Sequence, residues 1–315
     1  MLRFNAVIAT HGRSSLLQRT LDSLAETQRP DGFERVIVIE NGTAAGAEKE
    51  CRRAESKLPI EYRHTVLLGK SRALQQVLET LCEGFVLFLD DDIRVCPQLL
   101  EIYARAASEH GPDCFFGGPF QVDYQGDRPP AWLVDYLPWS AKGWNPEDPQ
   151  ESLKWNRFIG FNYGVFVQRV LSVGGFNPDI GPGALHAGTA CNPVGQETEM
   201  QNRLLDDGCR PVYLPEAMVW HYVPHSRCTP RWTLHRWYRM AVTEGMSETK
   251  ELEGPRWRGV PRWMYRRAAA LWWQAYRPNG SCDKSGRFNR KKQYHQWRGY
   301  MAGLRIQSQS AAGKK

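Results

Sequence analysis

The sequence predicts an α/β protein with a mostly parallel sheet flanked by helices, followed by a helical, basic C-terminal extension. In the first hundred residues, short apolar runs alternate with segments of helical spacing. This alternation is typical of a parallel sheet covered on both faces. From Thr229 onward the composition changes to 19 Lys and Arg against 5 Asp and Glu, with 7 of the 12 tryptophans. We therefore expect a domain at residues 1–228 and an extension at 229–315.

The elements of the first hundred residues follow one another in a regular order. Four apolar runs predict strands, at residues 4–9, 35–39, 60–66 and 85–89. A first helix begins at Ser14 or Ser15, either of which can cap it, and carries leucines at helical spacing. Further helices are predicted at about 44–56 and 71–81.

The middle of the chain is less regular. Strand character returns at 114–122 and 158–168, a helix is predicted at 197–205, and short strands follow at 210–214 and 217–222. Residues 126–156 contain five prolines and four tryptophans, which indicates a long ordered loop.

The composition narrows the class of protein. With 42% hydrophobic and 24% charged residues the chain is globular, which excludes collagen-like, disordered and coiled-coil proteins. No run reaches about 18 apolar residues, and the N-terminus lacks the pattern of a secretory signal. The eight cysteines form no C-x-x-C pair, so we expect reduced cysteines rather than disulfides or a zinc site. These features predict a cytoplasmic protein.

Three of the predicted strands end in polar clusters. The clusters are Thr10-His11-Gly12-Arg13, Glu40-Asn41-Gly42 and Asp90-Asp91-Asp92. In parallel α/β sheets, ligands bind beyond the carboxyl ends of the strands. Because the crossovers bring these ends to one edge, we expect a ligand site there.

The three consecutive aspartates suggest a metal site. Three carboxylates in a row repel one another, which is costly at the end of a buried strand unless a cation compensates. Mg²⁺ or Mn²⁺ binds carboxylate oxygens together with phosphate oxygens, and a nucleotide diphosphate is commonly held in this way. The alternative is a solvated acidic turn, but the apolar strand that precedes the aspartates favours the metal.

Two further positions contain candidate site residues. Glu197 and Glu199 lie at the start of a predicted helix, where acidic residues also suit the helix dipole. Since residues two apart point to different faces of a helix, we expect only one of them to face a substrate. His221 follows a predicted strand, where a lone histidine is more often structural, but near an acidic site it becomes a candidate metal ligand.

Short motifs occur in a fixed order between Asn5 and Arg227. They are Thr10-His11-Gly12-Arg13, Val36-Ile37-Val38-Ile39-Glu40-Asn41-Gly42-Thr43, Gly69-Lys70-Ser71-Arg72, Phe88-Leu89-Asp90-Asp91-Asp92, Asn162 with Arg169, Gly174-Gly175-Phe176-Asn177, Gly195-Gln196-Glu197-Thr198-Glu199-Met200 and Val219-Trp220-His221-Tyr222-Val223. Together they resemble a family 2 glycosyltransferase with the Rossmann-like GT-A fold and its D-x-D motif. The chain departs from the family pattern at Glu40-Asn41, where two aspartates are usual. It also departs at Gln196-Glu197, where Glu-Asp is usual.

The resemblance implies an enzyme of the hexosyltransferase type that moves a sugar, with inversion, from a nucleotide-diphosphate sugar to an acceptor hydroxyl. Residues 1–120 would form the nucleotide-sugar half and residues 121–228 the acceptor half. Glu197 would be the general base, and Asp92 with His221 would bind Mg²⁺ or Mn²⁺. The implied nucleotide-binding residues are Thr10, Arg13, Glu40, Arg72, Asp90 and Asp91. Further acceptor-side candidates are Glu199, Asn162 and Trp132, a residue equally suited to sugar stacking and to loop packing.

The basic extension contains a candidate membrane-binding helix at 262–276. Tyr265, Trp272 and Tyr276 can share one face there, with arginines on another, as in an interfacial helix on anionic lipid. The alternative is a helix packed on the catalytic body with a solvated charged face. The family's commonest setting is the assembly of surface polysaccharide or glycolipid, with a glycan or lipid-linked acceptor. We therefore expect peripheral association with the cytoplasmic face of the inner membrane.

Two other functions fit part of the sequence. A nucleic-acid-binding protein would explain the Arg- and Trp-rich extension but not the strand-end acids, and the sequence has no recognised nucleic-acid motif, so no nucleic-acid partner is expected. A sugar-nucleotide pyrophosphorylase also uses an α/β nucleotide-binding sheet. Its glycine-rich loop, which ends in a basic residue, is missing after the first predicted strand here.

Overall fold

A computed structural model describes residues 2–146, 157–184, 193–277 and 283–312, which fall into two compact units. The first unit comprises Met1–Asp123, Gly143–Leu185 and Gly195–Tyr222, and the second comprises Tyr124–Lys142, His186–Val194 and Val223–Lys315. The boundary predicted at residue 228 is close to Val223, where the chain enters the second unit for the last time. The sequence did not indicate that two earlier segments also belong to the second unit.

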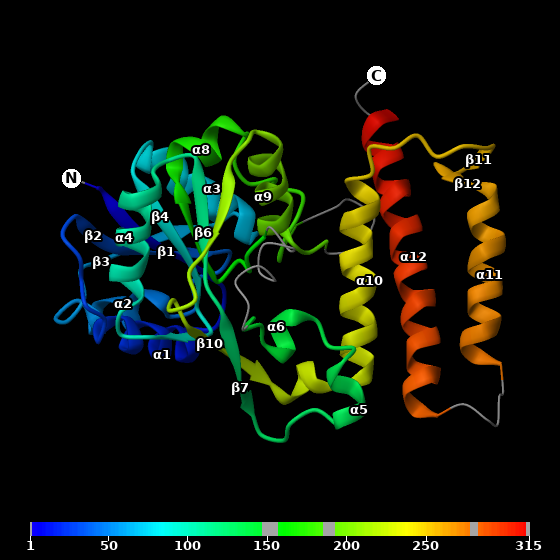
Figure 1. Ribbon diagram of the computed structural model, residues 1–315, viewed down its shortest axis with the longest axis horizontal. Helices are drawn as coiled ribbons and strands as arrows, with labels where there is room; N and C mark the ends of the chain where they lie inside the picture. The colour runs from blue at the N-terminus through cyan, green and yellow to red at the C-terminus, as the bar shows by residue number, and fades with distance from the viewer. Residues whose placement is uncertain (1, 147–156, 185–192, 278–282, 313–315) are drawn as a thin grey trace. The chain divides into compact units, whose positions relative to one another are not determined.

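The first unit is built on a seven-stranded sheet (Figure 1). The strands are β1 (Phe4–Thr10), β2 (Phe33–Asn41), β3 (Ile60–Thr65), β4 (Phe85–Asp90), β6 (Cys114–Gly117), β8 (Asn162–Phe166) and β9 (Arg210–Tyr213). They lie in the order β3-β2-β1-β4-β8-β6-β9. Strand β8 runs antiparallel to both of its neighbours, and the other pairs are parallel. The predicted class, a mostly parallel α/β sheet, is confirmed.

Helices cover both faces of this sheet. They are α1 (Ser14–Ala25), α2 (Ala47–Ala54), α3 (Lys70–Leu81), α4 (Leu99–His110), α8 (Val167–Ser172) and α9 (Gln196–Asp206). On one face, residues of α3, α8 and α9, among them Leu74 and Met200, join Phe88 of β4 in one core cluster. Because side chains alternate along a strand, Phe85 points to the other face. There it packs against Tyr103 of α4, with ring centroids 6.4 Å apart.

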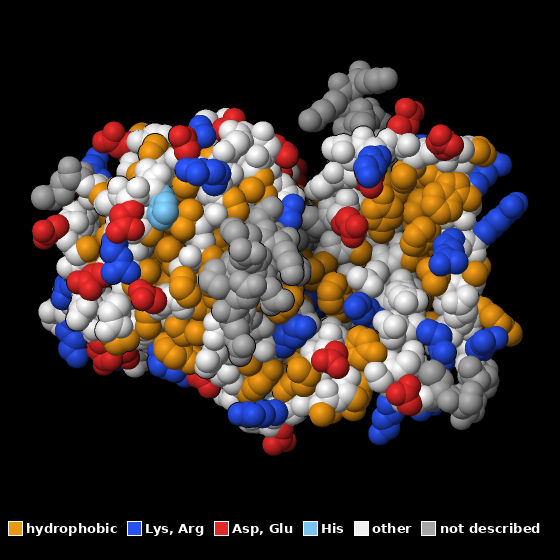
Figure 2. Space-filling view, viewed as in Figure 1, with side chains coloured by type: hydrophobic (Ala, Val, Ile, Leu, Met, Phe, Trp, Pro, Cys, Tyr) orange, Lys and Arg blue, Asp and Glu red, His pale blue; other side chains and the backbone are white. Residues whose placement is uncertain are grey.

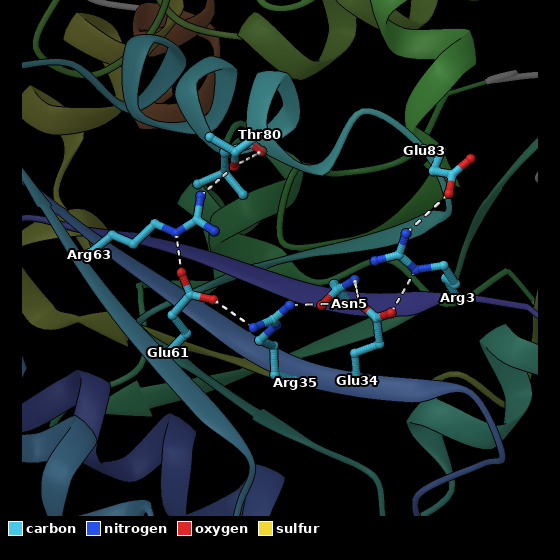
Figure 3. A network of polar contacts seen from close by, with 9 residues as sticks. Arg3, Asn5, Glu34, Arg35, Glu61, Arg63, Thr80 and Glu83 are labelled. Atoms are coloured by element: carbon cyan, nitrogen blue, oxygen red, sulfur yellow. Dashed lines mark hydrogen bonds and ion pairs between the residues drawn. The ribbon is translucent and has the colours of Figure 1, made fainter.

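A ladder of charged residues crosses the sheet near the amino ends of its strands (Figure 3). Arg3 pairs with Glu34 at 2.7 Å and with Glu83 at 3.1 Å. Arg35 pairs with Glu61 at 3.1 Å. Opposite charges on neighbouring strands favour this register. The ladder lies away from the carboxyl ends, where the polar clusters are.

Three predicted elements differ in the structure. The strand expected at 114–122 is split into β6 and β7 (Phe120–Gln125), because Pro119 between them has no amide hydrogen to donate. The strand expected at 158–168 starts only at Asn162 and gives way to α8 at Val167. The loop expected at 126–156 contains the short helices α5 (Ala131–Val134) and α6 (Trp139–Lys142), and its residues 147–156 lie outside the described part.

A three-stranded sheet has the order β5-β10-β7, with β5 at Ile93–Val95 and β10 at Val219–Pro224. Its β5 directly follows the three aspartates. The antiparallel register pairs Ile93 with His221. This pairing carries His221 to the end of β4, where the aspartates lie.

The second unit is mainly helical. Its elements include η1 (His225–Cys228), α10 (Pro230–Met246), β11 (Arg256–Trp257), β12 (Val260–Pro261), α11 (Arg262–Tyr276) and α12 (Lys284–Ala312). Helix α12 lies between α10 and α11 and packs against both (Figure 1). Helix α11 has the bounds that the sequence predicted.

Two further expectations concern the membrane and the cysteines. Within the described ranges, no helix combines the length and the apolar character needed to cross a membrane. The six described cysteines are free thiols, and Cys191 and Cys282 lie outside the described residues.

Candidate active site

The carboxyl ends of β1, β2 and β4 meet at one edge of the large sheet. β1 lies between β2 and β4, and its last residue, Thr10, is paired with Glu40. The side chain of Asn41 ties this edge together. Its Nδ2 donates to the Thr10 carbonyl at 2.8 Å, and its Oδ1 accepts from the Gly69 amide at 3.1 Å, next to the start of α3. The predicted meeting of the polar clusters is confirmed.

The chain supplies its own cations to the three aspartates. Lys70, the first residue of α3, pairs with Asp90 through its Nζ. Arg13 reaches both of the other carboxylates, at 2.5 Å from Asp91 and 2.6 Å from Asp92. Part of the charge compensation that the sequence analysis assigned to a metal therefore comes from these two side chains.

Asp91 is fully buried beneath this edge. The Thr10 hydroxyl donates to it at 2.6 Å. Burial raises the pKa of Asp91 to about 6, although the Arg13 guanidinium opposes that rise. Thr10 and Arg13 therefore anchor Asp91, and the nucleotide contact predicted for Asp91 stays a prediction.

Asp92 and His221 form a pair of possible metal ligands. His221 Nε2 lies 3.5 Å from Asp92 Oδ1, and both side chains are buried. The imidazole ring stacks on Phe161 with centroids 4.5 Å apart and planes at 12°, which fixes its orientation. A carboxylate and an imidazole suit Mn²⁺, and the carboxylate also suits Mg²⁺. No set of three or more ligating His, Cys, Asp or Glu side chains occurs among the described residues. The residues therefore fit a metal whose remaining ligands come from phosphate and water.

Lys70 is a site residue that the sequence analysis passed over. Lys70 belongs to the motif Gly69-Lys70-Ser71-Arg72, in which nucleotide binding was predicted for Arg72, two residues later on α3. Burial lowers the pKa of Lys70, but the negative charges of Asp90 and Glu197 raise it by more. The pKa therefore lies above its ordinary value. Its place directly after Gly69, at the helix start, is the signal that could have identified it.

The two glutamates of α9 have different surroundings. Glu199 is paired with Arg203 at 2.8 Å, and Arg203 in turn donates to the Gly175 carbonyl at 2.6 Å. Glu197 differs, because its Oε2 is buried and has no hydrogen-bond partner among the described residues. Of the two, Glu197 is therefore the one with a carboxylate oxygen available to a ligand.

The space for Glu197 depends on Gly160. A Cβ atom added at Gly160 would lie 2.8 Å from Glu197 Cδ and 3.1 Å from its Oε1. A Cβ atom essentially never lies within 3.0 Å of a non-bonded heavy atom. Any residue larger than glycine at position 160 would therefore displace the carboxylate of Glu197. Gly160 precedes β8 and was not among the predicted site residues.

Tyr163 of β8 is a second residue that the sequence analysis missed. Its ring stacks on Phe88 with centroids 4.9 Å apart, and its hydroxyl is buried with no hydrogen-bond partner among the described residues. Burial raises the pKa of Tyr163, and the charges of Glu197 and Asp90 raise it further. In the sheet register Tyr163 is paired with Phe88 of β4, two residues before Asp90.

Glu40 is buried and already hydrogen-bonded within the chain. Its Oε1 accepts from the Ala45 amide at 2.7 Å, and its Oε2 accepts from the Tyr62 hydroxyl at 2.7 Å. These bonds hold the turn after β2. The contact with a base or ribose predicted for Glu40 stays a prediction.

Asn162 and Trp132 have contacts that account for them structurally. The buried Asn162 accepts from the Tyr103 hydroxyl at 2.8 Å and donates to two backbone carbonyls, on the α4 face of the sheet. Trp132 belongs to the second unit, where it packs against Phe288 with centroids 5.5 Å apart. The sugar or acceptor contacts predicted for them gain no support from these positions.

A comparison with protein-family sequence models gives one match, to a family described as Glycosyl transferase family 2, over residues 6–170. This is just over half of the chain. A comparison with curated proteins gives no match.

Solved structures show the same fold. The mannosyltransferase PcManGT from Pyrobaculum calidifontis, in complex with GDP-Man and Mn²⁺, aligns with a TM-score of 0.53 and 16% identity over 100% of this chain and 88% of that one. GalNAc-T7 with UDP, GalNAc and Mn²⁺ aligns with a TM-score of 0.52 and 16% identity, over 78% of this chain. The match spans 51% of the GalNAc-T7 chain. At this identity the likeness concerns the fold, and it confirms the predicted GT-A fold.

Proposed function

The chain belongs to glycosyl transferase family 2 and is a glycosyltransferase, and we propose that it moves a sugar from a nucleotide-diphosphate sugar to an acceptor hydroxyl with inversion. The observation that carries the proposal is the buried, unpartnered Oε2 of Glu197. It lies on the same side of the sheet as the ion pair of Lys70 with Asp90. A carboxylate oxygen so placed is suited to accept a proton.

The proposed reaction is one direct displacement. Glu197 would take the proton of the acceptor hydroxyl at Oε2 as the hydroxyl oxygen attacks the anomeric carbon, and the bond from that carbon to the nucleoside diphosphate would break. Positioned proton transfer of this kind contributes roughly 10²–10⁴-fold in rate. A single displacement reverses the configuration of the anomeric carbon. It also needs no covalent intermediate between the sugar and the enzyme. The Tyr163 hydroxyl, also buried without a described partner, would orient a sugar or acceptor hydroxyl beside this base.

The donor end of the proposed site lies among the aspartates. Asp92 and His221 would hold Mg²⁺ or Mn²⁺. When bound, the ion would stabilise the leaving diphosphate as a Lewis acid. Lys70 and Arg13 would add positive charge beside it, and Arg13 is already in contact with Asp92. Support comes from the two aligned structures, which hold Mn²⁺ with UDP or with GDP-Man.

We propose a glycan or lipid-linked saccharide as the acceptor, in the assembly of surface polysaccharide or glycolipid. The basic C-terminal extension supports this setting, since an enzyme and a lipid-linked acceptor would share an anionic membrane surface. The remaining proposed nucleotide-binding residues are Thr10, Glu40, Arg72 and Asp90.

A panel of nucleoside diphosphates tests the donor site. UDP, GDP, dTDP and CDP are each added with Mn²⁺, Mg²⁺ or a chelator, and the unfolding temperature is measured. A ligand at 100 times its Kd should stabilise the fold by roughly 2.7 kcal/mol. We expect one diphosphate to stabilise the protein in a metal-dependent way, and Asp92→Ala to abolish the effect.

Asp113→Ala is the matched control, because Asp113 is an exposed aspartate of the first unit outside the site. It should respond to the diphosphate as the unaltered protein does. A folded protein that responds to no nucleotide would contradict the proposal. Release of pyrophosphate rather than nucleoside diphosphate from a donor would point instead to a pyrophosphorylase.

A further inference from the structure

Helix α11 exposes an unusual number of large aromatic side chains. The exposed fraction is 48% for Trp263, 49% for Trp272, 59% for Trp273 and 44% for Tyr276. Side chains of this size are normally buried, and a group of them on one element marks an interaction surface. Figure 2 shows hydrophobic and basic side chains side by side over the part of the second unit that contains α11.

Trp272 and Trp273 lie outside the packing of α11 on α12, whereas the partly exposed Trp263 and Tyr276 also contact the rings of Trp297 and Tyr294 of α12. The packed stripe of α11 consists of Met264, Leu271 and Ala275, which are buried. Met264 joins Met301 and Leu304 of α12 in one core cluster. At 100° per residue, the exposed aromatic residues lie on the remaining surface of the helix. Tyr265, Trp272 and Tyr276 were predicted to share one face, and the structure adds Trp263 and Trp273 as exposed aromatic residues of this helix.

The same surface is strongly basic. Arg262, Arg266 and Arg267 are exposed on α11, which contains no Asp or Glu. Helix α12 also contains none. From Pro255 to Lys315 the chain has 15 Lys and Arg and only one acidic residue, Asp283. An anionic partner would complement this charge.

The arrangement favours a membrane over a nucleic acid. Single-stranded nucleic acids are typically bound in basic grooves in which bases stack on aromatic rings. Here Trp272 and Trp273 are exposed together with three arginines on the surface of one helix. Amphipathic Trp and Tyr with flanking arginines suit the headgroup layer of a bilayer, where rings enter the acyl boundary and guanidinium groups pair with phosphates.

We propose that this aromatic–basic face docks the protein on an anionic phospholipid surface. The face consists of Trp263, Trp272, Trp273 and Tyr276 with Arg262, Arg266 and Arg267. The inference rests on the membrane setting of the proposed function and assigns it to one helix. It does not depend on the catalytic residues, all of which belong to the first unit.

Vesicle co-sedimentation of the full chain tests the proposal. Vesicles of phosphatidylcholine alone are compared with vesicles that also contain phosphatidylglycerol. We expect binding to the anionic vesicles that weakens at high salt. Trp272→Ala/Trp273→Ala should lower the partition constant about tenfold, since two interfacial rings are lost. Arg262→Gln/Arg266→Gln/Arg267→Gln should remove most of the preference for anionic lipid.

Matched controls come from exposed side chains of the first unit. Arg52→Gln/Arg53→Gln/Arg105→Gln removes three exposed helix arginines, and Leu67→Ser removes an exposed apolar residue. Both should bind vesicles as the unaltered protein does. Equal binding by the α11 variants and the unaltered protein would overturn the proposal. So would failure of the unaltered protein to bind, or displacement of vesicles by single-stranded RNA at equal phosphate concentration.

The same preparations are assayed for stabilisation by nucleoside diphosphates. The α11 variants should still be stabilised by the nucleoside diphosphate, although they bind vesicles more weakly. A protein that binds vesicles through α11 but no nucleotide would contradict the proposed function and leave this inference standing.

Discussion

Glu197 has a buried carboxylate oxygen without a described partner, and its side chain lies directly against Gly160. The family pattern has a shorter aspartate at this position, so the chain must accommodate one extra methylene. Gly160 provides that space, since a Cβ there would overlap Glu197 Cδ. We therefore regard Gly160 as a positioning residue for the proposed base.

Gly160→Ala should lower turnover by about 10- to 100-fold, because a displacement of about 1 Å can cost 10²-fold in rate. The backbone at Gly160 is not in the left-handed region, so alanine is tolerated conformationally. The nucleotide affinity should change less than the turnover, because the three nearest atoms to the added methyl group all belong to Glu197. Turnover like that of the unaltered protein, in a variant with unchanged nucleotide affinity, would contradict this role.

Lys70 and Arg72 can be compared directly on one helix. Lys70→Met should lower kcat/KM about 10- to 100-fold, because it removes a charge-assisted bond to Asp90. Arg72→Met should have a smaller effect, since its position gives it no described ion pair with the aspartates. Steady-state kinetics with the identified donor would measure both. A larger loss in Arg72→Met would support the sequence-based assignment and contradict the structural one.

At the scale of elements, α10 and α12 are in backbone contact through glycines. A Cβ at Gly303 would lie 2.1 Å from the Val242 carbonyl oxygen, and one at Gly299 would lie 2.2 Å from that of Tyr238. Two glycines four residues apart thus line one face of α12. This contact joins segments far apart in the sequence, so the local pattern did not predict it.

Gly303→Ala tests the contact through the sign of its effect. In a helix interior, Gly to Ala normally stabilises by about 1 kcal/mol. Here the added methyl group must separate α10 from α12, and we expect a loss of about 1–3 kcal/mol. Thermal unfolding, with hydrogen exchange of α10, would measure it. A more stable variant would contradict the close approach of these helices.

The pairing of α10 with α12 should also depend on pH. Burial and nearby arginines lower the pKa of His235 and of His295, which are on α10 and α12. The unfolded chain therefore takes up these protons at higher pH than the folded chain. Stability of the second unit should fall as the pH drops below about 6.5, the unfolded value.

Unfolding temperatures between pH 8 and pH 5 would test this dependence. The His235→Gln/His295→Gln variant should lose less stability on acidification than the unaltered protein. Identical pH dependence in the two proteins would show that these histidines do not cause it.

At the scale of the whole molecule, local patterns predicted the elements and long-range contacts decided the site. Apolar runs and helical spacing depend on neighbouring residues, and they predicted the order from β1 to β4 and the polar strand ends. Arg13 and Asp92 are 79 residues apart, and Lys70 and Asp90 are 20 apart. These ion pairs form only because the crossovers bring distant residues together, so they could not be predicted from the sequence. The negative charge of the aspartates was therefore expected to be compensated by a metal alone.

The same reasoning explains what was missed around Glu197. The periodicity of α9 did not distinguish Glu197 from Glu199 as the residue that faces a substrate. The ion pair of Glu199 with Arg203 leaves Glu197 as the candidate. Tyr163 has the pattern of an ordinary strand residue, because only the tertiary structure buries its hydroxyl without a described partner. Gly160 carries no local signal, since its role is to leave space for another segment.

The most direct test of the account compares Glu197→Gln with Glu199→Gln. Release of nucleoside diphosphate is measured with the donor sugar of the nucleotide that stabilises the protein most. Glu197→Gln should lose at least about 10²-fold in turnover while binding the nucleoside diphosphate normally, because only the proton acceptor is removed. Glu199→Gln should keep its turnover and lose some stability, because Arg203 loses its partner. Near-normal turnover in Glu197→Gln, or an equal loss in both variants, would contradict the assignment of Glu197 as the general base.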